Sequence, residues 1–320
     1  MAFREKVIKN NFGISYPHEM LAVNFIFIME SENQSWGLQG EVPDKTWECM
    51  WECLGRVHIA SFEPDMIIEC NRWATLAASN NYEEFSKLLK SEPPSSTILH
   101  KVLLQLMSTQ QLWTLSGSEN EYTFIRYLID PCLSATLGGI KYTKADWTTL
   151  LEETRGPGSR LLFPDFTIVT QLRDRSCSLL HLEGKTAANK GQSQIWDDLT
   201  KLGQELKYSL DTLILQEPSG PVSVIGILLM GYNLEFFVMT LHSDGVYIFK
   251  KYAECYLFNK ADNMFPLCRL LEILEATKRM VEITLANLRA VKITPSETPL
   301  VPLSWRRPSF EKPRKMLMPE

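Results

Sequence analysis

Two short motifs near the middle of the chain could do chemistry together. Pro164-Asp165 opens one predicted strand, and Glu183-Gly184-Lys185 closes the next one. Because alternate residues of a strand share a face, Glu183 and Lys185 project to the same side. A hairpin between the two strands would bring Asp165 beside them. Two carboxylates at that distance repel each other unless a cation lies between them, and Mg²⁺ (or Mn²⁺) suits oxygen ligands that leave room for water and phosphate.

Such a site could hydrolyse a phosphodiester bond. A bound metal ion would lower the pKa of a water molecule and neutralise the charge that develops at phosphorus. Lys185 could position or deprotonate that water, or stabilise the negative charge. The alternative for these motifs is a surface Glu–Lys pair at a strand end, worth roughly 0–1 kcal/mol. His181 shares the face of Glu183 and could approach the phosphate or Asp165, or it could be a packing or surface histidine without a chemical role.

The strands that carry these motifs are predicted by apolar and β-branched runs. They cover 166–172 and 177–185, and the charged turn between them covers 173–176. A long helix follows over about 192–215. Leucines recur along this helix at helical spacing and define an apolar stripe: Leu199, Leu202, Leu206, Leu210 and Leu213.

The opposite face of the 192–215 helix is polar. Gln204 and Tyr208 lie on this face together with Lys201 and Glu205. These four side chains could face the backbone of a substrate or only solvent, and the pattern leaves both possibilities open.

The remaining elements flank this central region. Helices are predicted over 44–57, 79–90, 97–115, 119–133 and 265–291, and further strands over 222–231, 233–242 and 246–252. Residues 138–158 form a polar connection before the hairpin. Helices and strands alternate without regular βαβ units, so the sequence predicts a mixed α/β (α+β) fold.

Composition and charge restrict the class of protein. The 320 residues are 45% apolar and 22% charged, as in ordinary globular proteins. No apolar run reaches the roughly 18–20 residues of a membrane span, and no signal peptide is recognised. We therefore expect an intracellular protein of the nucleus or cytoplasm that does not bind a membrane. The net charge of −5 is uneven: residues 1–100 hold 8 Lys and Arg against 14 Asp and Glu, and the other 220 are close to neutral at +1 (−5 minus −6).

The central region resembles the PD-(D/E)XK nuclease superfamily. Pro164-Asp165 matches the first element of its motif, Glu183-Gly184-Lys185 the second, and Gln204-Glu-Leu-Lys-Tyr208 the Gln-x3-Tyr of RecB-like members. This resemblance implies a restriction-endonuclease-like αβββαβ sandwich. It also implies catalytic and site roles, as follows. The catalytic residues would be Asp165, Glu183 and Lys185. The metal ligands would be Asp165 and Glu183, with Glu119 or Glu121 of the first core helix as a further ligand. The substrate would be bound by Gln204, Tyr208 and Lys201.

A closer resemblance is to a nuclease-like family of early-branching (Mucoromycota-type) fungi. It rests on Leu182-Glu-Gly-Lys185, Leu199-Thr-Lys-Leu-Gly-Gln-Glu-Leu-Lys207, Gly226-Ile-Leu-Leu-Met-Gly231 and Ser243-Asp-Gly-Val-Tyr247, and covers roughly residues 118–290. We accordingly expect a helical N-terminal region over 1–115, a nuclease-like domain over 116–292, and a Pro-rich, basic, flexible tail over 293–320.

Two functions follow as expectations. The first is a metal-dependent nuclease that hydrolyses phosphodiester bonds of nucleic acid, with DNA favoured over RNA. The second is a catalytically inactive protein of the same fold that binds a protein or nucleic acid. In either case the acidic N-terminal region is a candidate site for a protein partner.

Overall fold

The structure is a computed structural model that describes most of the chain. It describes residues 17–29, 43–53, 56–79, 81–108, 125–148, 150–151, 161–173, 175–185, 192–242, 245–258, 260–290 and 301–307. Within these ranges, the side chains of residues 17–18, 50, 53 and 192–196 are not described. Glu119 and Glu121, the two candidates for an additional metal ligand, lie outside the described residues.

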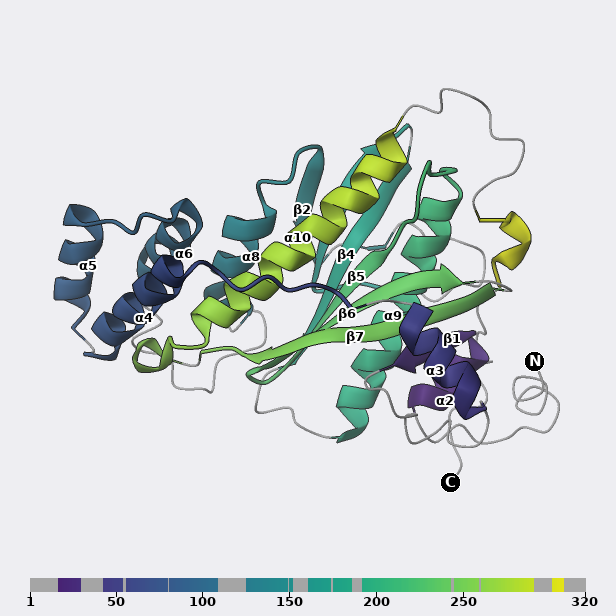
Figure 1. Cartoon of the computed structure of the whole chain (residues 1–320), viewed down its shortest axis with the longest axis horizontal. Coiled ribbons are helices and arrows are strands. Elements are labelled where there is room, and N and C mark those ends of the chain that lie inside the picture. The colour runs from purple at the N-terminus through teal and green to yellow at the C-terminus, as the bar shows by residue number, and fades with distance from the viewer. Residues whose placement is uncertain are drawn as a thin grey trace.

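Within the described ranges, seven strands form one open, mixed sheet in the order β1-β7-β6-β5-β4-β3-β2 (Figure 1). The strands are β1 (Ile26–Met29), β2 (Thr143–Trp147), β3 (Phe166–Leu172), β4 (Arg175–Lys185), β5 (Val224–Met230), β6 (Asn233–His242) and β7 (Val246–Tyr256). β4 runs parallel to β5, and β1 runs parallel to β7. The other neighbouring pairs are antiparallel.

Eight α-helices surround the sheet in the described part of the chain. They are α2 (Pro17–Val23), α3 (Asp44–Cys53), α4 (Pro64–Ala78), α5 (Tyr82–Ser91), α6 (Thr97–Ser108), α8 (Asp130–Leu137), α9 (Gln192–Ile214) and α10 (Leu267–Arg289). A π-helical turn, η2 (Ile125–Ile129), leads directly into α8, and short 3₁₀ turns occupy Ala261–Asn263 and Leu303–Trp305. The fold is therefore mixed α/β, as the sequence predicts.

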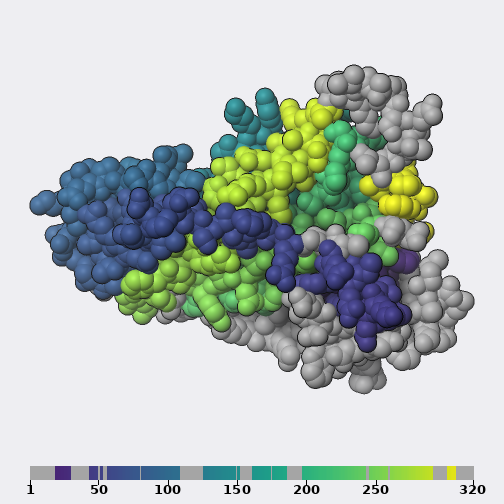
Figure 2. Space-filling model, in the orientation of Figure 1, coloured from purple at the N-terminus to yellow at the C-terminus, as the bar shows by residue number. Residues whose placement is uncertain are grey.

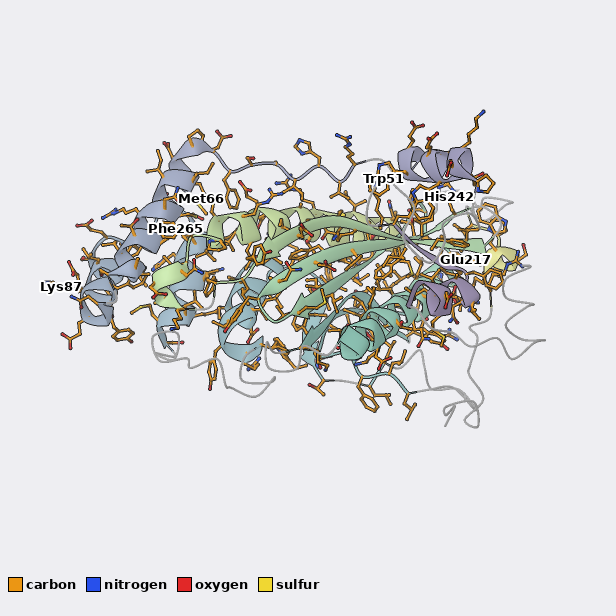
Figure 3. The ribbon with its side chains drawn as sticks, turned by 90° about the horizontal axis from the view of Figure 1, so that it is seen from below. Trp51, Met66, Lys87, Glu217, His242 and Phe265 are labelled. Atoms are coloured by element: carbon orange, nitrogen blue, oxygen red, sulfur yellow. The ribbon has the colours of Figure 1, made fainter. Side chains whose placement is uncertain are left out.

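Helices cover both faces of the sheet, so the centre of the molecule has three layers (Figures 1 and 3). The leucine stripe of α9 is buried against one face, where a side chain at Gly226 of β5 would collide with Leu202 and Leu206. α10 lies on the other face. Gly184 of β4 points to that second face, since an added Cβ there would lie 2.8 Å from Ile125 of η2. Two covered faces explain why β5 reads as a continuous apolar run.

The predicted elements and the observed ones agree best in the central region. β3 has the predicted bounds, β4 starts two residues before the predicted 177, and α9 and α10 end within two residues of the predicted ends. The connection over 138–158, expected to lack regular structure, contains the edge strand β2. The N-terminal region, expected to be helical, contributes a second edge strand, β1. Of the described residues in the helix predicted over 119–133, Ile125–Ile129 form the π-helical turn and α8 begins at Asp130, where Pro131 fits the first turn because its missing N–H needs no partner there.

Helices α4, α5 and α6 form one end of the molecule, as Figures 1 and 2 show. They are joined to α3, at the other end, by residues 56–63, which run along α10. The backbone N–H of Phe62 donates to Oε1 of Glu272 on α10 at 2.9 Å and so holds this connection in place. The acidic N-terminal part thus contacts the central sandwich both through these helices and through β1.

Residues 301–307, within the segment expected to be a flexible tail, pack against α9 and β7. The ammonium group of Lys207, a buried residue, donates to the carbonyl of Arg307 at 2.6 Å and to Oδ2 of Asp211 at 3.2 Å. The hydroxyl of Tyr247 donates to Asp211 as well, and Arg306 lies 3.5 Å from the same carboxylate. A buried ionic cluster therefore fixes this C-terminal segment.

No helix in the described ranges has the length and apolar character needed to cross a membrane.

Candidate functional site

The open end of the β3–β4 hairpin brings Asp165 and Glu183 together. Thr167 pairs with His181 and Phe166 pairs with Leu182, so Asp165 comes directly before the ladder and Glu183 directly after it. The backbone N–H of Asp165 donates to the carbonyl of Leu182 at 3.1 Å, and the charge of Asp165 raises the pKa of Glu183. The juxtaposition expected from the two sequence motifs is therefore present.

Gly184 binds the Asp165 carboxylate to β4 through a hydrogen bond. Its backbone N–H donates to Oδ2 of Asp165 at 2.8 Å. A charge-assisted hydrogen bond of this kind fixes the carboxylate and satisfies a backbone donor at the same time. Because the other side of Gly184 abuts Ile125, a larger residue at this position would have to displace that side chain. The residue between Glu183 and Lys185 is thus constrained from both directions.

Lys201 of α9 binds the site from the opposite element. Its ammonium group donates to Oε2 of Glu183 at 2.7 Å, and Oε1 lies at the same distance without the geometry of a hydrogen bond. The same group donates to the carbonyl of Phe163 at 2.8 Å and lies 3.8 Å from Glu205. The polar face of α9 is therefore not a solvent face at this point. It covers the carboxylates.

Burial dominates the electrostatics of the two glutamates. Glu183 is 1% exposed, and burial together with the nearby charge of Asp165 raises its pKa to about 7, although Lys201 pulls it down. Glu205 is fully buried, and neither of its carboxyl oxygens receives a hydrogen bond from a described residue. Burial and the charge of Glu183 raise the pKa of Glu205 well above its usual range. The protein interior therefore favours the neutral form of this carboxyl group.

The lysine keeps its charge in this surrounding. Burial alone would lower the pKa of Lys201, but the attraction of Glu183, Glu205 and Asp165 outweighs it and raises that pKa. One ammonium group therefore neutralises part of a cluster of three acidic side chains.

Lys185 lies on the same face of β4 and approaches α9 nearer to the start of that helix than Glu183 does. Its ammonium group is 3.9 Å from Oδ2 of Asp198 on α9, and its side chain is 27% exposed. Lys185 therefore lies at the rim of the cluster rather than within it.

His181 is a buried packing histidine. It is fully buried, and its Nε2 lies 2.7 Å from Oγ of Ser209 on α9. Burial and the charge of Lys201 lower the pKa of His181 to about 3, so the ring is neutral at physiological pH. The expectation that it could reach a phosphate gives way to the alternative of a packing role.

Gln204 and Tyr208, predicted to bind substrate, are half-buried on α9. Among the described residues, neither of them contacts Asp165 or Glu183. Lys201, which the sequence analysis groups with them, does contact Glu183. In the described ranges, no set of three or more His, Cys, Asp or Glu side chains is placed to hold a metal ion.

Of the two further acidic residues of the site, Asp198 is absent from the sequence interpretation, and Glu205 appears there only as one residue of the polar face of the helix. The signal that could have found them is the spacing along α9. Asp198, Lys201, Glu205 and Ser209 recur at intervals of three and four residues, which is one stripe of a helix. This polar stripe borders the leucine stripe and faces β4.

Comparison of the chain with protein-family models, with curated protein sequences and with solved structures finds no match.

Proposed function

We propose that this chain is a metal-dependent nuclease that hydrolyses phosphodiester bonds of nucleic acid, with DNA as the preferred substrate. The observation that carries the proposal is the hydrogen bond of the Asp165 carboxylate to Gly184, which brings this carboxylate beside Glu183 at the open end of the β3–β4 hairpin. The element order α8-β2-β3-β4-α9-β5 supports it, because this is the αβββαβ order of the PD-(D/E)XK fold that the sequence motifs suggest.

The donor set fits Mg²⁺ or Mn²⁺ in a site of low ligand number. Mg²⁺ in proteins is commonly held by one or two carboxylates and completes its shell with waters and substrate phosphates. Asp165 and Glu183 would be the two carboxylates, and Oε1 of Glu183 is a buried oxygen without a hydrogen bond. When bound, the ion supplies a water of lowered pKa and positive charge near the scissile phosphate.

The two lysines have separate tasks in this proposal. Lys185, partly exposed at the rim, would stabilise the negative charge of a substrate phosphate. Lys201 holds Glu183 in position and keeps the pKa of that carboxyl from rising further. A proton on Glu183 must leave when a cation binds, because a metal-binding carboxylate is deprotonated. The buried carboxyl group of Glu205 adds to the charge that disfavours this ionisation.

A second candidate function is a catalytically inactive interaction module of the same fold. The ion pair of Lys201 and Glu183 favours it, since the lysine already neutralises the carboxylate without a metal ion. Under this alternative, the cluster would be a structural tie between α9 and β4, and the acidic N-terminal part would bind a partner protein.

Cleavage of nucleic acid by the purified full chain separates the two functions. We expect cleavage of DNA with Mg²⁺ or Mn²⁺ and none with EDTA, and a loss of at least about a hundredfold in Glu183→Gln and Lys185→Met. The matched controls are Glu282→Gln and Lys144→Met, an exposed glutamate of α10 and an exposed lysine of β2. Metal-dependent cleavage that survives in Glu183→Gln would contradict the proposed site. A complete lack of cleavage on DNA and RNA would favour the interaction module.

A further inference from the structure

Leu161 and Phe163 lie on one outward side of the segment that leads to Asp165 and β3. Exposed and buried residues alternate there: Leu161 is 51% exposed and Phe163 is 45% exposed, whereas Leu162 and Pro164 are buried. Alternation of this kind means that every second side chain shares a side of an extended chain. Two large apolar side chains are therefore exposed within four residues of Asp165 instead of packing in the core.

This segment is fixed on both sides by hydrogen bonds. Lys201 donates to the carbonyl of Phe163 at 2.8 Å, and the backbone N–H of Leu151 donates to the carbonyl of Leu162 at 3.0 Å. Asp165 is held through its backbone N–H and its carboxylate by β4. The ring of Phe163 thus projects from a backbone that is already ordered, and contact with a ligand would cost little further conformational entropy.

Leu161 and Phe163 differ from the other exposed apolar side chains in their closeness along the chain. Among the large apolar side chains that the structure describes as exposed, Leu161 and Phe163 alone lie within two residues of one another. Lysines border the site, Lys201 beneath the segment and Lys185 at the rim. An apolar ring next to carboxylates and lysines that would handle a phosphate is the arrangement needed to stack a nucleobase while its backbone is held by charge.

We propose that Phe163 is the stacking platform for an unpaired base next to the scissile phosphate, and that the substrate is consequently nucleic acid with a single-stranded or frayed segment at the cleavage point. The assignment rests on the proposed nuclease function. Bases paired in an intact duplex keep their faces against their neighbours, so only an unpaired base can present its face to Phe163. Leu161 would contact the next base or its sugar.

The test uses the full chain and one DNA strand in two forms, single-stranded and in a blunt duplex, with a fluorescent adenine analogue at the position next to the cleaved bond. We expect KM to be lower for the single strand, and stacking on Phe163 to quench the analogue. Phe163→Ala should raise KM for the single strand about tenfold, the size of one lost base–aromatic stack, and abolish the quenching, with kcat changed far less. Phe163→Trp should preserve both signals.

The matched control is Phe265→Ala. Phe265 is 51% exposed, precedes α10 on the opposite face of the sheet from α9, and lies at the end of the molecule formed by α4 to α6 (Figure 3). Equal KM values for Phe163→Ala, Phe265→Ala and the unchanged chain would overturn the stacking role while leaving the nuclease function intact. A preference for the blunt duplex would overturn it as well. If the unchanged chain neither cleaves nor binds either DNA, the proposed function itself fails, and the exposed pair then belongs to a protein contact.

Discussion

The ammonium group of Lys201 lies 2.7 Å from the carboxylate of Glu183, although 18 positions separate the two residues in the chain. This contact joins α9 to β4, the strand that carries the Glu-x-Lys motif. The chemistry of Glu183 is therefore set by the helix as much as by its own strand, because burial under α9 raises its pKa and Lys201 lowers it.

Asp165 has a structural and a chemical role that two substitutions separate. Asp165→Asn retains an oxygen that can accept the N–H of Gly184, so we expect it to unfold at nearly the same urea concentration as the unchanged chain while cleavage falls at least about a hundredfold. Asp165→Ala should lose cleavage and also about 1–2 kcal/mol of stability, since the Gly184 donor is left without this acceptor. Urea unfolding and DNA cleavage measure the two effects. Equal stability of the two variants would show that the hydrogen bond has no structural weight.

Metal-dependent cleavage should depend on pH through Glu183. Its pKa of about 7 means that the carboxyl is protonated below that pH and must release its proton before it can bind a cation. Activity at low metal concentration should thus fall about tenfold per pH unit below the midpoint. In Lys201→Met the midpoint should move to higher pH, because the charge that lowers the pKa of Glu183 is gone.

The control for this pH profile is Lys185→Met. Lys185 lies at the rim beside Asp198, so its removal should lower the maximal rate and leave the midpoint where it is. A midpoint that does not move in Lys201→Met would contradict the electrostatic coupling between α9 and β4.

Glu205→Gln should stabilise the protein as pH rises. The folded-state pKa of Glu205 is raised, so between its unfolded pKa of roughly 4.3 and its folded pKa the native state binds more protons than the unfolded state. Stability of the unchanged chain then falls with rising pH across this window. Glutamine has nearly the same shape and no charge to bury, so the variant escapes this loss. Urea unfolding from pH 4 to pH 8 measures the difference, with pH values chosen to bracket that window.

The matched control for this stability experiment is Glu282→Gln, an exposed glutamate of α10. It should differ from the unchanged chain by no more than about 0.5 kcal/mol at either end of the pH range. If Glu205→Gln shows the same small, flat difference, the buried carboxyl group does not cost stability and its proposed protonation is wrong.

The ionic cluster around Asp211 should contribute strongly to the free energy of unfolding. Asp211→Asn removes the negative charge that pairs with the buried ammonium group of Lys207, and we expect a loss of about 3 kcal/mol in the free energy of unfolding. The surface pair of Lys144 and Asp146 gives the comparison, since Lys144 is 75% exposed and Asp146→Asn should cost less than about 1 kcal/mol. A chain that ends at residue 300 should be destabilised like Asp211→Asn, because Lys207 loses the carbonyl of Arg307.

The sequence predicts the central hairpin, α9 and the three following strands well, because those segments have strong period-two or period-3.6 patterns and the residues at their ends are turn formers. β2 is missed because Thr143-Lys-Ala-Asp-Trp147 is a polar edge strand that pairs on one side only. β1 is missed because it pairs with β7, more than 200 positions away in the sequence, and only that pairing defines it. Contacts over such separations leave no local pattern.

The candidate site also contains residues that the sequence predicts and residues that it does not. Asp165, Glu183 and Lys185 follow from two dipeptide-scale motifs on consecutive strands, and the structure does bring the two carboxylates together. The position of Lys201 on Glu183, and the burial of Glu205, depend on the rotation of α9 about its axis. A helix with two polar stripes can turn either one to the sheet, and tertiary packing of the leucines decides which.

The ionic cluster of Lys207 also imposes an order on the folding of a newly made chain. The lysine and its carbonyl acceptor on Arg307 are 100 positions apart, so synthesis from the N-terminus delivers the lysine long before the acceptor. Until then, α9 can lie on the sheet only with a buried ammonium group that lacks its shortest hydrogen bond. The side of the molecule that holds residues 301–307 should consequently be the last to close, well after the β3–β4 hairpin has formed.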